Sequence, residues 1–148
     1  LHEELSDVLI KHVTVKRNNR DLTKAIEAIK EIRERYQNIC LDDKGSCLNQ
    51  TYVFANQFSY MLEIALVITK GALLRDEFRG AHYKPECPHR DDKNWLKTTI
   101  AAYQNTEPEI SYKPVDLRYL KPIERDYSKA KKAIPEFENV PTNIVLPL

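Results

Sequence analysis

The sequence predicts a mainly α-helical protein, with an antiparallel three-helix bundle of the spectrin-repeat type followed by a small β-hairpin and an extended C-terminal tail. All eight prolines lie between Pro85 and Pro147, and proline interrupts helices. Before Pro85 the apolar residues recur at helical spacing, whereas two short β-branched runs after it flank a polar connection. We therefore expect the bundle at residues 1–80, and a loop, a hairpin and an irregular tail at residues 81–148.

The composition excludes several classes of function. A net charge of +1 is too small for a typical nucleic-acid-binding domain, and three glycines are too few for a dinucleotide or phosphate cradle. Three cysteines argue against a disulfide framework and favour a reducing, intracellular compartment. The most apolar run, residues 61–74, is shorter than the roughly 20 residues of a membrane span, so we expect a soluble protein. The chain begins at Leu1 without an initiator Met or a signal-peptide pattern, which suggests a segment of something longer.

Two shorter helices open the predicted bundle. The first is expected to end near Val15 and to bury one face, formed by Leu5, Val8, Leu9, His12 and Val13. The second follows a turn at Asn18-Asn19, is capped by Asp21 or a neighbour, and has an apolar seam at Leu22, Ile26, Ile29, Ile32 or Arg33, Tyr36 and Ile39. Its opposite face is charged, and we expect it to be solvated.

A third and longest helix is expected from an N-cap at Asn49 to about Arg79, with Gly80 as a left-handed C-cap. Such a helix would be about 45 Å long at 1.5 Å per residue. Its middle, residues 61–68, is apolar around most of its circumference, so the helix should be covered on more than one side.

The hairpin is expected from two strands, Trp95–Tyr103 and Glu109–Val115, joined by the five residues 104–108. A helix over residues 92–103 is the competing interpretation, and Thr98, Thr99 and Ile100 favour the strand. From Asp116 onward there is no sustained period, which indicates a wrapping tail or a disordered segment.

The sequence offers only weak candidates for metal-binding or catalytic residues. Cys40 and Cys47 lack the spacing of a metal-binding pair, and Cys87-Pro88-His89 with His82 nearby lacks the second pair of ligands that structural zinc takes. His12 is expected to pack rather than to act as a base. Because no nucleophile stands at motif spacing from a base, we predict no catalytic, cofactor-binding or metal-binding residue in this chain.

The densest group of polar and aromatic side chains lies after the third helix, between Arg79 and Trp95. One interpretation is that arginines and aspartates pin a non-repetitive loop through salt bridges and caps. The other is that the loop meets a partner, because Arg, His, Tyr and Trp are favoured at interfaces. On that second interpretation the candidate interface residues are Arg79, His82, Tyr83, Arg90, Asp91 and Trp95.

Several strings in this part resemble the C-terminal region of succinate dehydrogenase and fumarate reductase flavoprotein subunits. They are Arg79-Gly80-Ala81-His82, then Arg90-Asp91-Asp92-x-Asn94-Trp95-Leu96-Lys97-Thr98-Thr99, then Tyr112-x-Pro114-Val115, and in the tail Lys121-Pro122-x-x-Arg125-Asp126-Tyr127. The helical part is similar to the family's helical domain as well. One departure is that Asp76-Glu77-Phe78 precedes Arg79, where the family usually reads Glu-Ser, so no role of that Ser is carried over.

The resemblance implies a longer parent enzyme that oxidises succinate to fumarate, or runs the reverse, through covalently bound FAD. It passes electrons to an iron–sulfur subunit that is docked on a membrane anchor. The family's flavin-binding and catalytic residues lie upstream of this segment. The resemblance therefore implies a non-catalytic domain that holds no cofactor, packs on the FAD domain and helps to contact the iron–sulfur subunit. It also implies a cytoplasmic location on the inner face of the cell membrane, or the matrix side in a mitochondrion.

Two alternatives remain open from the sequence. L-aspartate oxidase has a similar helical C-terminal domain and a similar loop, but the strings around Arg90 and Arg125 favour the dehydrogenase. A free-standing helical adaptor with no enzyme attached is the alternative from another class.

Overall fold

The computed structural model describes residues 1–119 and 122–123. Four helices and two strands follow one another in the order α1 (His2–His12), α2 (Asn19–Tyr36), α3 (Gln50–Leu73), α4 (Asp92–Trp95), β1 (Lys97–Ala102) and β2 (Glu109–Pro114). The chain divides into two compact units, Leu1–Val115 and Asp116–Leu148. All six elements belong to the first unit, so the prediction of a mainly helical chain with a β-hairpin is confirmed.

The N-termini of the two longer helices are closed by asparagine side chains. The Asn18 side chain accepts a hydrogen bond from the amide of Asp21 at 2.8 Å, so the cap of α2 is the turn residue Asn18. The Asn49 side chain accepts one from the amide of Tyr52 at 2.7 Å, which confirms the predicted cap of α3. Each bond satisfies one of the backbone N–H groups that a helix leaves unpaired at its start.

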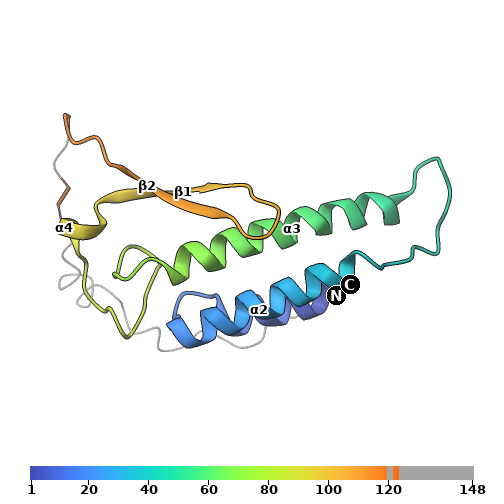
Figure 1. The fold of residues 1–148 in the computed structure, drawn as a ribbon, viewed down its shortest axis with the longest axis horizontal. Coiled ribbons are helices and arrows are strands. Elements are labelled where there is room, and N and C mark those ends of the chain that lie inside the picture. Colours follow the sequence, from blue (N-terminus) through green and yellow to red (C-terminus); the bar gives the residue numbers. More distant parts are fainter. Residues whose placement is uncertain (120–121, 124–148) are drawn as a thin grey trace, which may run out of the picture. The chain divides into compact units, whose positions relative to one another are not determined.

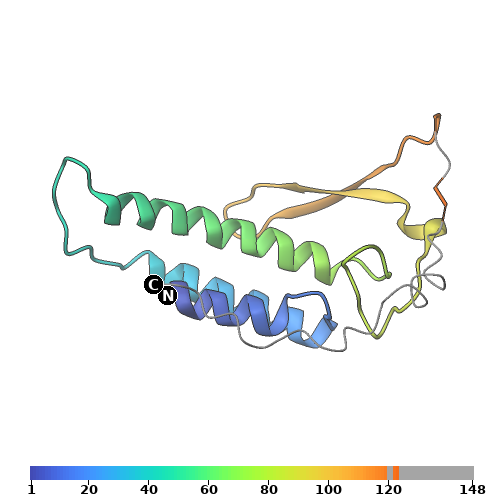
Figure 2. The same cartoon turned by 180° about the vertical axis from the view of Figure 1, so that it is seen from behind.

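The core of the first unit lies where α1 and α2 pack against one side of α3 (Figures 1 and 2). Its main buried cluster draws on all three helices and consists of Leu5, Ile26, Ile29, Ile32, Phe58, Leu62, Ala65 and Leu66. The predicted charged face of α2 is exposed, as expected. The seam residues Leu22, Ile26, Ile29 and Ile32 are buried, because their three- and four-residue steps put them on one stripe of α2. The predicted seam residue Ile39 lies beyond the end of α2 and is exposed.

All three helices end earlier than predicted. The first ends at His12 rather than Val15, and the second at Tyr36 rather than Ile39. The third ends at Leu73, about 36 Å from its start at 1.5 Å per residue, so the predicted end near Arg79 is wrong. Gly80 does adopt a left-handed conformation, with φ of 59°, but in a loop turn and not as a helix cap.

Lys84 explains the early end of α3. Its side chain has no exposed surface, and its ammonium donates hydrogen bonds to the carbonyl of Leu73 at 2.7 Å and to the carboxylate of Asp76 at 2.9 Å. A cation at this place satisfies a terminal carbonyl and complements the negative end of the helix dipole. Lys84, eleven residues after Leu73, therefore caps the C-terminal end of α3.

The hairpin lies along α3 on the side away from α1 and α2 (Figure 1). Its strands are antiparallel and pair Lys97 with Pro114 and Ala102 with Glu109, so the connection is six residues long rather than five. Thr99 on β1 approaches α3 at Gly71, where a Cβ would be 3.9 Å from the threonine methyl. The competing helix interpretation holds only for the single turn Asp92–Trp95.

The predicted tail begins in the second unit and lies largely outside the described residues. Within the described part of that unit, the guanidinium of Arg118 pairs with the carboxylate of Asp116 at 2.7 Å.

Candidate functional site

The buried carboxylate of Glu77 lies at the centre of the loop that follows α3. Its side chain has no exposed surface. Its Oε1 accepts hydrogen bonds from Arg75 at 2.6 Å and Arg79 at 2.7 Å, and its Oε2 accepts one from the amide of Asp91 at 3.2 Å. Burial raises the pKa of Glu77, but these donors outweigh it and the pKa lies below its ordinary value. A buried, ionised carboxylate thus ties two segments of the loop together.

A second carboxylate extends this network towards solvent. Asp92 accepts hydrogen bonds from Arg90 and from Arg79, both at 2.6 Å, and these bonds lower its pKa to about 2. The hydrogen bonds to Glu77 raise the pKa of Arg79 above its ordinary value. Glu77, Arg79, Asp92 and Arg90 therefore form a chain of alternating charge that leads from a buried carboxylate to the exposed Asp92.

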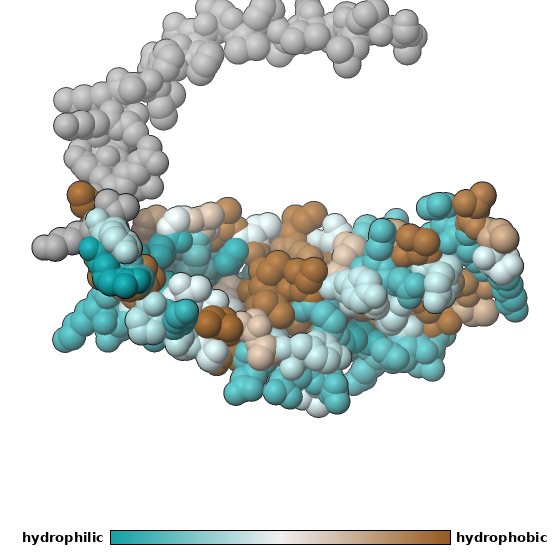
Figure 3. All heavy atoms as spheres, turned by 90° about the horizontal axis from the view of Figure 1, so that it is seen from above, coloured by the Kyte–Doolittle hydropathy of each residue, from teal (hydrophilic) through white to brown (hydrophobic). Residues whose placement is uncertain are grey.

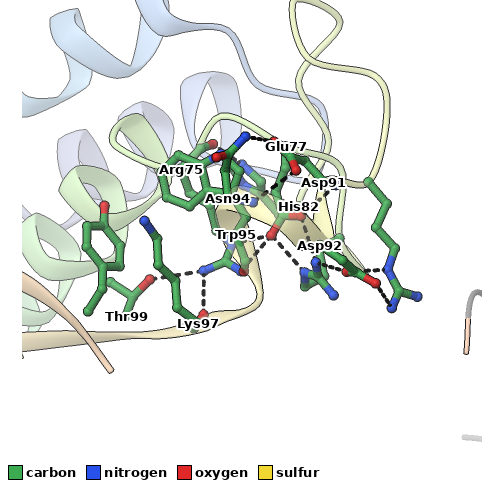
Figure 4. Close-up of polar contacts among 12 residues, drawn as sticks. Arg75, Glu77, His82, Asp91, Asp92, Asn94, Trp95, Lys97 and Thr99 are labelled. Atoms are coloured by element: carbon green, nitrogen blue, oxygen red, sulfur yellow. Dashed lines mark hydrogen bonds and ion pairs between the residues drawn. The ribbon is translucent and has the colours of Figure 1, made fainter. Parts of the chain in front are cut away.

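Arg75 connects the loop to the hairpin. Besides Glu77, its guanidinium donates hydrogen bonds to the carbonyls of Trp95 at 2.8 Å and Lys97 at 3.2 Å, and to the hydroxyl of Thr99 at 3.2 Å (Figure 4). These acceptors lie at the end of α4 and the start of β1. One guanidinium therefore fixes where the hairpin leaves the loop.

Trp95 packs on the hairpin. Its ring meets that of Tyr112 edge to face with centroids 5.6 Å apart. The ammonium of Lys97 lies 4.4 Å from the centroid of Trp95 and 4.2 Å from that of Tyr112. Such cation–π contacts hold the aromatic pair in a fixed arrangement.

His82 joins the loop to the segment between α1 and α2. Its Nε2 lies 2.8 Å from the carbonyl of Arg75, and its Nδ1 lies 2.9 Å from the guanidinium of Arg17. Burial lowers the pKa of His82, and the charges of Arg17 and Lys84 act in the same direction. The ring is therefore neutral at pH 7, donating from Nε2 and accepting at Nδ1.

Tyr83 continues the same connection through its backbone. Its amide donates to the carbonyl of Val15 at 3.2 Å, and its carbonyl accepts from the amide of Arg17 at 2.9 Å. Its ring meets Phe78 edge to face at 5.7 Å. Phe78 stands directly before Arg79, so this position packs against an aromatic ring.

A separate ion cluster holds the tip of the hairpin. Glu107 pairs with Lys30 of α2 and, at 2.8 Å, with Lys70 of α3. Hydrogen bonds from these two lysines lower the pKa of Glu107 to about 2. Arg33 adds a hydrogen bond to the carbonyl of Thr106 at 2.6 Å. The hairpin is thus anchored at both ends, by Arg75 and by Glu107.

The six predicted interface residues are half-buried, and the structure gathers them into this network. Arg79 and Asp91 meet at Glu77, Arg90 joins through Asp92, and His82 and Trp95 join through Arg75. Tyr83 lies beside them on Phe78. The interpretation that salt bridges and caps pin the loop is confirmed, and Asp91 caps α4 by accepting from the amide of Asn94 at 3.0 Å.

Sequence reasoning missed the residues that organise the network, Glu77, Arg75 and Lys84. Each lies in a segment that was expected to be helical or plain loop, where a charged side chain indicates solvent. The available signal was the spacing Arg75-x-Glu77-x-Arg79, which puts a carboxylate two residues from each of two guanidinium groups. Helix geometry would have kept these side chains apart, because residues two apart do not face each other on a helix.

Hydrogen bonds and ion pairs connect the charged side chains of the network to one another and to the backbone. Within residues 1–119 and 122–123, no three His, Cys, Asp or Glu side chains gather as a metal site would require. Cys40 and Cys47 are exposed and Cys87 is half-buried, and all three are free thiols. In the same part of the chain, no helix is both long enough and apolar enough to span a membrane.

The comparisons with known proteins all point to one family. The chain matches the family model described as "Fumarate reductase flavoprotein C-term" over residues 2–127. It is 46% identical to the succinate dehydrogenase flavoprotein subunit of Bacillus subtilis over 135 residues, which cover 90% of this chain and 23% of that protein. It is 33% identical to the fumarate reductase flavoprotein subunit of Haemophilus influenzae, over 90% of this chain and 22% of that protein.

A comparison of structures points to the same family. A solved structure of Escherichia coli quinol fumarate reductase superimposes with a TM-score of 0.77 and 26% sequence identity. The match covers 82% of this chain and 21% of that chain. The chain thus spans about a fifth of the length of the relatives it matches.

Proposed function

Because the chain belongs to the family of fumarate reductase flavoprotein C-terminal domains, we propose that it serves as the non-catalytic C-terminal domain of a succinate dehydrogenase or fumarate reductase flavoprotein subunit. The parent chain would bind FAD and interconvert succinate and fumarate. The observation that carries this proposal is the match over residues 2–127, together with a loop in which Arg75 pairs with Glu77, and Arg79 pairs with both Glu77 and Asp92.

The domain's role in that enzyme would be support and assembly. Its helices would form the antiparallel bundle of the spectrin-repeat type expected from the sequence, packed on the FAD domain of the same chain. Through the iron–sulfur subunit and its membrane anchor, the complex would lie on the inner face of the cell membrane, or on the matrix side of a mitochondrial membrane.

The Arg79–Trp95 loop is the proposed contact with the iron–sulfur subunit. Arg79, His82, Tyr83, Arg90, Asp91 and Trp95 are half-buried, which leaves part of each available to a partner. The buried Glu77 holds Arg79 and Asp91 directly, and its partner Arg75 holds Trp95 and His82. Such preorganisation lowers the entropy cost of binding. An Arg-rich and aromatic surface of this kind is typical of the centres of protein interfaces.

The enzyme assignment is tested with the full-length protein that contains this sequence. We expect it to purify with bound FAD and to reduce an artificial electron acceptor with succinate as the donor. Oxidation of L-aspartate in place of succinate would identify the L-aspartate oxidase alternative. A preparation without flavin would favour the free-standing adaptor.

The loop contact is tested by Arg90→Ala, because Arg90 pairs with the exposed Asp92 and not with the buried Glu77. We expect less iron–sulfur subunit to co-purify with the variant. Arg35→Ala is the matched control, since Arg35 also forms a surface ion pair, with Glu4 on α1. Wild-type co-purification of the Arg90→Ala variant would contradict the proposed contact.

A further inference from the structure

The outward face of α3 is apolar, although it lies on the surface of the first unit. Side chains at helical spacing along this face are exposed, and they form what we call the α3 stripe: Val53, Tyr60, Met61, Ile64 and Ile68. Tyr60 is 66% exposed and Ile64 is 57% exposed. Figure 3, viewed from the hairpin side, shows apolar side chains gathered in the middle of this unit.

No charged residue of α3 interrupts the stripe, although the exposed polar residue Gln57 lies within it. The helix contains Glu63 and Lys70, and both are engaged at its flank, Glu63 with Arg33 of α2 and Lys70 with Glu107 of the hairpin. The outward face of α2 in the same bundle is lined with charged residues instead, among them Glu27, Glu31 and Glu34. The outward face of α3 is therefore apolar, whereas that of α2 is charged. An exposed apolar stripe of this length marks an interaction surface.

A groove lies beside the middle of the stripe. It has a volume of about 580 Å³, and Tyr36, Tyr60, Ile64 and Tyr103 line it together with the paired Arg33 and Glu63. An apolar groove with aromatic walls can receive a large side chain of a partner, as the central pockets of interfaces do. The stripe and groove together thus offer a continuous contact with one deeper anchoring point.

We propose that the α3 stripe and this groove pack permanently against the FAD domain of the same parent chain. The proposal rests on the proposed function above. The relatives are more than four times as long as the part of them that this chain matches, so in the proposed parent chain a large covalently attached domain would accompany this one. Permanent interfaces are more apolar than transient ones and resemble a divided domain core, which matches the stripe. The polar Arg79–Trp95 loop is then left for the separate subunit.

Other occupants fit the stripe less well. Helices that lie on a membrane surface expose a strongly charged face opposite the apolar one. The opposite face of α3 is instead buried against α1 and α2 through residues such as Leu62 and Leu66. A second copy of the chain remains as a measurable outcome of the test.

Photo-crosslinking in the full-length flavoprotein tests the inference. The photoreactive residue p-benzoylphenylalanine replaces Ile64 on the stripe, or Ile10 on α1 as the matched control, which is 65% exposed and lies off the stripe. After irradiation, the crosslinked peptides are identified by mass spectrometry. We expect the residue at position 64 to crosslink to the upstream part of the same chain, and the residue at position 10 to give no such product.

A crosslink from position 64 to a second copy, to another subunit or to lipid would overturn the inference, as would no crosslink. If the full-length protein carries flavin and oxidises succinate while such a result is obtained, the inference alone fails. If the protein carries no flavin, the proposed function fails. As a second measure, Ile64→Asp is expected to lower the flavin-loaded fraction severalfold after gel filtration, while Ile10→Asp leaves it at the wild-type level.

Discussion

At the scale of single residues, Glu77 determines the shape of the loop. A buried carboxylate between two guanidinium groups is stable only while its charge is matched, because an uncompensated buried charge is costly. The positions of Arg79, Asp91 and Trp95 follow from this one side chain and from its partner Arg75.

We expect Glu77→Gln to lower the free energy of unfolding by about 3 kcal/mol, because it leaves Arg75 without its charge partner and Arg79 with Asp92 alone. Urea unfolding followed by the fluorescence of Trp95 measures the change. Glu63→Gln is the control: Glu63 is partly exposed and pairs with Arg33 at 3.3 Å, so its loss is expected to cost less than about 1 kcal/mol. An equal loss of unfolding free energy in the two variants would show that the buried Glu77 stabilises the fold no more than a surface carboxylate does.

The residues of the loop could be named from the sequence because Arg, Asp and Trp outside regular structure indicate either a cap or an interface. Their partners could not, because Glu77 and Lys84 look like ordinary surface residues until tertiary structure buries them. The partner of Arg35 could not be predicted from the sequence either. Its guanidinium pairs at 2.6 Å with Glu4 on α1, and not with a carboxylate one turn away on its own helix.

At the scale of elements, the ends of α3 have different origins. Its start is encoded locally, since Asn49 is a strong N-cap residue and three residues later the amide of Tyr52 receives its bond. Its end is set by Lys84 across the loop, and this is why the sequence pattern placed that end too late.

We expect Asn49→Ala to lower the free energy of unfolding by about 1 kcal/mol, because the amide of Tyr52 loses its acceptor. Thermal unfolding followed by circular dichroism measures it. Asn49→Asp should keep most of the stability, since aspartate also caps helices. A loss of the same size in both variants would exclude capping as the cause.

The hairpin tip is expected to respond to acid through Glu107. Its pKa is lowered to about 2 in the folded state from 4.5, so its contribution is present above pH 4.5 and is lost as the pH falls towards 2. We expect the melting temperature of Glu107→Gln to fall less than that of the wild type between pH 6 and pH 3. Glu27→Gln on the exposed face of α2 should keep the wild-type fall. An unchanged pH dependence in Glu107→Gln would mean that the lysines do not hold the hairpin.

At the scale of the whole molecule, the first unit presents a polar, internally braced loop at one place and an apolar stripe along α3 at another. The periodicity of residues 61–68 indicated that α3 should be covered on more than one side, and within this unit the stripe is left exposed. The sequence motifs identified the family because they lie in the loop and hairpin. They could not locate the stripe, which depends on which sides of α3 are covered by α1, α2 and the hairpin.

Succinate turnover per bound flavin tests the central claim, that this domain supports the enzyme without taking part in its chemistry. The measurement uses the full-length protein with Arg90→Ala, His82→Gln or Ile64→Asp. We predict that each variant keeps the wild-type turnover per flavin and the wild-type KM for succinate, even where less flavin-loaded or assembled protein is recovered. A severalfold lower turnover per flavin in a variant that is fully loaded with flavin would contradict the account.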